Sequence, residues 1–191
     1  MPSDAFHNHL EQLLRDAEEL DDAHVQLRTG NPGRQYKLAS LNRAVVIATV
    51  SAWESYVEQL VRESVLALRP AGPPFADPWP ALNAYVTGRL GRFNTPNQHN
   101  VEELIRSCLG LSNVHHTWTW QNCTSAQAVQ RLDGAMDFRH RIAHGVNPRP
   151  TVHNLYSSQL PEFFGRLAQC TDEAVRNHLV AVHGLANPWP V

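Results

Sequence analysis

Apolar residues recur at helical spacing along most of the chain, and alternating strand-like runs are nearly absent. Positions three and four apart predict a first helix over about residues 3–28, capped at its start by Ser3 or Asp4. A second helix is predicted over about residues 34–68. Residues 45–53 leave it hardly any polar side, which is typical of a central helix that is buried all round.

The middle of the chain is less regular. Residues 70–74 hold three prolines and a glycine, which end the second helix firmly. Short helices are predicted over residues 81–90 and 101–109. The stretch 110–122 carries two histidines and two tryptophans without a clear period.

Helical periodicity returns in the last third of the chain. Thr124 or Ser125 is expected to cap a helix that runs to about His144, where Gly145 stops it. A last helix is predicted over about residues 157–183. Together these segments predict one all-α domain over residues 1–191, a bundle of four main helices with short helices inserted between the second and the third. Residues 184–191 are expected to form a loose tail, with docking of its Trp189 as the alternative.

Composition and charge narrow the class of protein. The chain has 191 residues, 42% of them hydrophobic and 18% charged, which is an ordinary globular composition. The formal net charge is −2, so any nucleic acid must bind a local basic cluster rather than a global basic field. The first predicted helix is strongly acidic on its polar face and is expected to repel phosphate.

The cysteines and the apolar runs bear on location. Cys108, Cys123 and Cys170 are widely spaced and show no paired pattern, which favours a reducing compartment. The start of the chain has no apolar signal-peptide core, and the longest apolar stretch, residues 45–50, is too short to cross a membrane. We therefore expect a cytoplasmic protein without a membrane segment.

The richest local motif is residues 138–145, which read Phe-Arg-His-Arg-Ile-Ala-His-Gly. Arg139 supplies a fixed cation, and His144 supplies a group that can carry a proton near neutral pH. RNA brings its own nucleophile, the 2′-hydroxyl, so such a pair suffices to move protons and to neutralise charge on phosphorus. Arg139 and His144 are about 140° apart around an ideal helix, whereas His140 and His144 share a face. For Arg139 and His144 to converge, Arg139 must reach round the helix, the last turn must loosen, or a second copy of the chain must bring the two groups together.

Two alternatives to a catalytic motif stay open. Arginine and histidine in the last turn of a helix also interact favourably with the helix dipole and its free carbonyls. The stretch 131–153 has the clearest positive excess, and Arg141 and Arg149 are its candidate substrate-binding residues. The same stretch could equally be a solvated basic loop.

Glu54 lies in the apolar middle of the second predicted helix. A buried carboxylate is costly unless it is paired, and Arg139 or Arg141 is a reasonable partner that Glu54 could hold in position for phosphate. Alternatively, Glu54 sits at a groove edge and binds water or Arg43.

Metal and cofactor motifs are weak. The eleven histidines are not accompanied by the CxxC cysteine pair of a zinc site. His140 and His144 have HxxxH spacing, but no glutamate follows the first histidine as it does in a zinc-protease helix. We expect neither a metal nor a cofactor.

Residues 139–145 resemble the R-x4–6-H motif of the HEPN superfamily of small all-helical ribonucleases, with His140 in the slot for a polar residue. The stretch from Leu41 to Val57, with its Trp53-Glu54 pair, looks like the second helix of the RiboL-PSP branch. Residues 93–97 and 101–110 look like the next landmarks of that branch.

The resemblance implies a HEPN-like bundle that dimerises, with a composite site at the dimer interface. It implies a metal-independent endoribonuclease that cleaves RNA by 2′-hydroxyl attack, in which Arg139, His144, His140 and Glu54 form the site. Many members of the superfamily act as toxins or in antiviral defence and are restrained by an antitoxin or inhibitor protein. Others bind nucleotide or RNA without cutting, so a non-catalytic module that binds RNA or a partner protein is the alternative.

Overall fold

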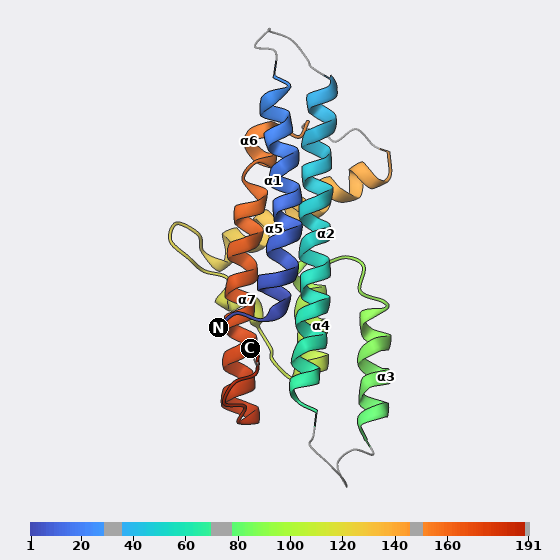
Figure 1. The fold of residues 1–191 in the computed structure, drawn as a ribbon, viewed down its shortest axis with the longest axis vertical. Helices are drawn as coiled ribbons and strands as arrows, with labels where there is room; N and C mark the ends of the chain where they lie inside the picture. The colour runs from blue at the N-terminus through green and yellow to red at the C-terminus, as the bar shows by residue number, and fades with distance from the viewer. Residues whose placement is uncertain (29–35, 70–77, 146–150, 190–191) are drawn as a thin grey trace.

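The computed structural model describes residues 1–28, 36–69, 78–145 and 151–189. These residues form an elongated bundle in which several helices run along the long axis of the molecule (Figure 1). Extended backbone pairs in these ranges only at an isolated bridge between Trp120 and Cys123. The all-α prediction is confirmed.

In the described ranges the longer helices have 16 to 32 residues and occupy the segments that the periodicity predicts. They are α1 (Glu11–Gln26), α2 (Tyr36–Ala67), α5 (Ser125–Ala143) and α7 (Leu160–His183). Shorter elements surround them: the π-helical turn η1 (Ala5–Leu10), α3 (Trp79–Leu90), α4 (Gln98–Leu109), the 3-10 turn η2 (Val114–Thr117) and α6 (Asn154–Ser157). None of the described helices is long and apolar enough to cross a membrane.

Helix α2 is the centre of the bundle and contacts η1, α1, α4, α5 and α7. Trp53, Tyr56 and Leu60 of α2 are fully buried. The Trp53 ring lies 5.6 Å from that of Tyr56, 6.0 Å from that of Phe164 on α7 and 6.2 Å from that of Trp118. The other helices therefore pack around the apolar stretch of α2, because this packing removes its apolar side chains from water.

The polar atoms of these buried aromatic residues all have partners. Trp53 Nε1 donates to the carbonyl oxygen of Pro96 at 2.9 Å, and Tyr56 Oη donates to that of Ala168 at 3.0 Å. Trp118 Nε1 donates to Thr171 Oγ1 at 2.9 Å. Each bond ties a loop or α7 to the core and removes the cost of burying an unpaired polar group.

The ends of α5 match their sequence signals. Thr124 caps the start, and its capping box with Gln127 satisfies two backbone donors. His144 is the C-cap, and Gly145 has a φ of +69°, a left-handed conformation that glycine adopts without strain. The residues of the sequence motif therefore lie in the last turn of α5 and at its end.

The first residues of the chain are fastened to the bundle. Ser3 caps η1 by accepting a hydrogen bond from the backbone N–H of Phe6 at 3.1 Å. Ser3 also donates through its backbone N–H and its hydroxyl to the buried carboxylate of Asp172 on α7. Glu63 of α2 accepts from the backbone N–H groups of Asp4 and Ala5, each at 3.0 Å.

The docking of Trp189, which the sequence left open, is seen at the end of the chain. Trp189 is only 2% exposed and packs against the core. Burial of this large apolar ring offsets part of the conformational freedom that the segment 184–188 loses.

Replacing Trp53 by Phe is expected to lower the free energy of unfolding by about 1–3 kcal/mol, because the Pro96 carbonyl loses its donor inside the core. Trp79 on α3 is half-buried and donates no hydrogen bond to any of the described residues, so Trp79→Phe is the matched control, expected to stay within about 0.5 kcal/mol. Urea unfolding measures both. Equal effects of the two substitutions would contradict the role given to the Trp53 hydrogen bond.

Candidate functional site

The last two turns of α5 are oriented by the core residues that precede them. Leu132 and Ala135 are fully buried, and Met136 is 9% exposed. The ring of Phe138 packs against Tyr156 of α6 at 5.0 Å between centroids. With this face of α5 fixed, Arg139 is half-buried and the residues on the outer face reach solvent.

Arg139 points toward α2, where its Nη2 lies 3.9 Å from Glu54 Oε2. The side chains of Arg139 and Glu54 are 34% and 21% exposed, so the pair sits at the boundary between core and solvent. The sequence left open which group pairs with Glu54. The structure answers with Arg139, whereas Arg43 binds Ser40 at 3.0 Å.

Burial is the main cause that raises the pKa of Glu54 above its usual range. The positive charge of Arg139 lowers this pKa, and the negative charge of Glu58 one turn along raises it again. A separation of 3.9 Å is too long for a strong hydrogen bond. Glu54 therefore attracts Arg139 without occupying the N–H donors of its guanidinium. Relative to Glu54, these donors stay available for another anion.

His140 and His144 form a pair of imidazoles on the outer side of α5. Their ring centroids are 4.3 Å apart, and both residues are exposed. The spacing of four residues brings the rings together on one helix face, as the sequence predicts.

The cation and the imidazole pair do not meet within one chain. Arg139 faces Glu54 on α2, and in the described part of the chain no contact joins its guanidinium to His140 or His144. His144 has left ideal helical geometry, with φ −89° and ψ 14°, but its ring still contacts that of His140, tilted by 56°. The angular separation expected from an ideal helix therefore persists in the fold.

The two further arginines named from the sequence have different outcomes. Arg141 contacts Asp137 on its own helix through two nitrogens, with Nε at 3.0 Å from Oδ1 and Nη2 at 2.9 Å from Oδ2. Its charge is thus partly neutralised one turn before the motif ends. Arg149 lies outside the described residues.

Another histidine is organised by a carboxylate that the sequence did not single out. His115 Nδ1 lies 2.6 Å from Glu102 Oε2 on α4, and the same oxygen accepts from Gln98 Nε2 at 2.8 Å. Glu102 Oε1 accepts from the backbone N–H of Asn113 at 3.1 Å. Because Glu102 gathers three donors, it fastens η2 to α4. In the described residues no three His, Cys, Asp or Glu side chains are placed to hold a metal ion together.

One comparison with known proteins, the scan against family models, gives a match. The model of the RiboL-PSP-HEPN family matches residues 11–177, which include α2 with Glu54 and all of α5. The chain belongs to the RiboL-PSP-HEPN family. The search of curated proteins and the search of solved structures give no match for this RiboL-PSP-HEPN protein. Its family membership accounts for the helical fold and places the motif at the end of α5 within the matched region.

Arg139→Ala is expected to raise the pKa of Glu54 further, because the guanidinium is what opposes the effect of burial. Glu58→Gln is the matched control and should lower the same pKa, since it removes a nearby negative charge. Carboxyl carbon chemical shifts followed against pH measure both changes. A Glu54 pKa that ignores Arg139→Ala would show that the two side chains do not interact in solution.

Proposed function

We propose that this protein is a metal-independent endoribonuclease whose site is built at the end of α5. The observation that carries the proposal is that the end of α5 presents a half-buried cation, Arg139, paired with Glu54, and, on its outer side, two exposed imidazoles whose centroids are 4.3 Å apart. Membership of the RiboL-PSP-HEPN family supports the proposal, because the wider superfamily includes ribonucleases.

The chemistry needs one group to remove a proton and one to supply it. His144 exchanges a proton with the 2′-hydroxyl or with the leaving 5′-oxygen, and His140 serves as its partner or orients the phosphate. As the 2′-oxygen bonds to phosphorus, the bond to the 5′-oxygen breaks and the leaving oxygen takes up the proton. The products are a 2′,3′-cyclic phosphate, which water can open to a 3′-phosphate, and a 5′-hydroxyl end.

Arg139 supplies the charge that the reaction requires. Negative charge builds on the phosphoryl oxygens in the transition state, and a preorganised guanidinium stabilises it with donors that are already in place. Glu54 braces Arg139 in that position. Arg141 and Arg149 are proposed to bind neighbouring phosphates, with Arg141 exchanging Asp137 for RNA.

We propose that two chains complete the site. Within one chain Arg139 and the imidazoles face different ways, so a twofold dimer that opposes the ends of α5 would bring the cation of one chain to the imidazoles of the other. We further propose a cytoplasmic, toxin-like or antiviral role in which an antitoxin or inhibitor protein restrains the enzyme.

A non-catalytic module is the second candidate. The contacts of Arg139 with Glu54 and of Arg141 with Asp137 favour it, because both cations already have acidic neighbours. In that case the protein would bind RNA or a protein partner without cutting, and any RNA binding would weaken as salt rises.

His144→Ala should reduce RNA cleavage by roughly 10²–10⁴-fold, the usual contribution of a general acid or base. Arg139→Ala should reduce cleavage by roughly 10²–10³-fold, since it removes one stabilising donor. His99→Ala is the matched control, because His99 is an exposed histidine on α4. The assay incubates purified protein with total RNA and EDTA and counts new ends. Full activity of His144→Ala, or a strict need for Mg²⁺, would contradict the mechanism.

An RNA oligonucleotide with a single 2′-deoxy nucleotide on the 5′ side of the cleaved bond should resist cutting at that bond alone, because the attacking oxygen is missing. Mass spectrometry of the unmodified products should find the 2′,3′-cyclic phosphate. Cleavage of the deoxy-substituted bond, or a 3′-hydroxyl product, would mean that water or another group is the nucleophile.

A further inference from the structure

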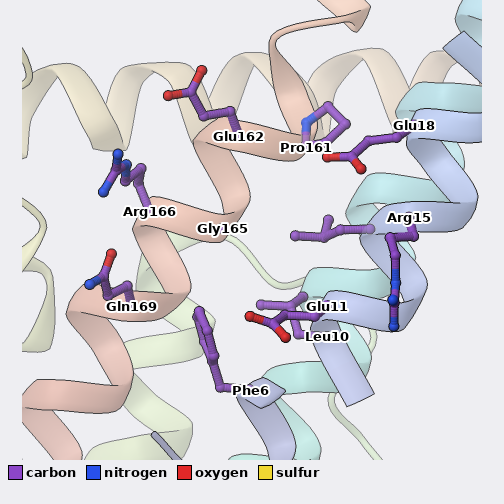
Figure 2. Close-up of a pocket in the computed structure, with 11 residues that line it drawn as sticks. Phe6, Leu10, Glu11, Arg15, Glu18, Pro161, Glu162, Gly165, Arg166 and Gln169 are labelled. Atoms are coloured by element: carbon purple, nitrogen blue, oxygen red, sulfur yellow. The ribbon is translucent and has the colours of Figure 1, made fainter. Parts of the chain in front are cut away.

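A groove of about 450 Å³ runs between the N-terminal helical segment and the first half of α7 (Figure 2). Its lining residues come from η1, α1 and α7, and none comes from α5. It is therefore separate from the proposed RNA site. Its volume lies in the range of about 300–1,000 Å³ that is usual for ligand pockets.

The floor of the groove is apolar, and on the α7 side one lining residue is a glycine without a side chain. Phe6, Leu10 and Leu14 line one side, and Gly165 of α7 lies opposite. A Cβ added at Gly165 would meet Leu14 Cδ1 at 3.7 Å, an ordinary van der Waals contact, so a larger side chain at this position would reach into the groove over Leu14. Glycine inside a helix costs about 1 kcal/mol relative to alanine, and here it keeps the groove open.

The acidic and basic side chains that line the groove point in different directions. In Figure 2, Glu11 and Glu18 reach toward the gap between the helices. Arg15 runs along α1, and Arg166 turns to the far side of α7, away from the gap. The lining has three glutamates, Glu11, Glu18 and Glu162, against two arginines, Arg15 and Arg166, so it carries a small excess of negative charge.

The neighbouring surface of α1 strengthens this negative field. Asp16, Glu19 and Asp22 of α1 are exposed, and Glu162 adds a further exposed carboxylate from α7. Glu11 has an ion pair with His7 at 3.2 Å, whereas no ion pair of Glu18 is found among the described residues. Such a surface repels the phosphates of RNA and attracts a basic protein segment.

We propose that this groove binds a lysine or arginine side chain on a basic, amphipathic segment of a partner protein. The aliphatic stem of that side chain lies on Phe6 and Leu14 beside Gly165. Its charged end lies between Glu11 and Glu18. Long basic side chains bind in this way because the stem leaves water while the charge keeps polar partners.

The probes are two synthetic helical peptides with the same leucine face, one flanked by arginines and the other by glutamates at the same positions. Fluorescence anisotropy with the full chain measures their affinities, and ¹⁵N–¹H spectra of the full chain locate the contact. The arginine peptide should bind and shift the signals of residues 6–18 and 161–169, and the glutamate peptide should not bind.

Glu18→Gln should weaken the arginine peptide roughly fivefold, as the loss of one charge pair does. Glu19→Gln is the matched control, because it removes the same charge from the same helix outside the groove lining and should change affinity less. Gly165→Leu should abolish binding by filling the groove. It should not lower the free energy of unfolding, since leucine is the better helix former.

Several outcomes would overturn the proposal: no binding of the arginine peptide, equal binding of both peptides, signal shifts confined to α5, or affinity that ignores both Glu18→Gln and Gly165→Leu. Light scattering gives one more test. A dimer of the wild-type chain that Gly165→Leu separates would show that the occupant is a second copy of this chain, which also overturns it.

Discussion

The packing of Trp53 is the interaction on which the rest of the structure depends. Its ring contacts rings from α2, α7 and the segment after η2, and its indole N–H fixes the loop at Pro96. Because Trp53 points into the core, the next residue is turned by about 100° around α2. That rotation brings Glu54 to the edge of the core, facing α5. The burial of Trp53 in the core therefore determines where the Glu54 carboxylate of the candidate site lies.

The site follows from a balance between burial and charge. Burial raises the pKa of Glu54, and Arg139 opposes it from 3.9 Å away. This arrangement orients the guanidinium at moderate cost and leaves its donors free for an anion, whereas a close bidentate pair would compete with phosphate. The imidazoles of His140 and His144 lie on a different face of α5. One chain thus carries the cation and the imidazoles on different sides of α5, which is why the proposed function depends on a second chain.

Local signals made much of the fold predictable. Periodicity located the helices, and the signals at Thr124 and Gly145 located both ends of α5. The sequence named Arg139 or Arg141 as the partner of Glu54, because a carboxylate in an apolar helix needs a cation, but it left water or Arg43 open as the alternative. Contacts between distant segments were not predictable in this way. Ser3 meets Asp172 across 169 positions, Glu102 meets His115 only after the intervening loop folds back, and Trp189 docks from a segment without periodicity.

The most direct test of the composite site uses two inactive variants together. Chains with Arg139→Ala and chains with His144→Ala are unfolded separately, mixed, refolded and assayed for RNA cleavage with EDTA present. If the cation of one chain serves the imidazoles of the other, mixed dimers contain one intact site, and activity rises well above that of either variant refolded alone. If the mixture stays as inactive as its components while refolded wild type cleaves RNA, the site does not combine Arg139 and His144 from two chains.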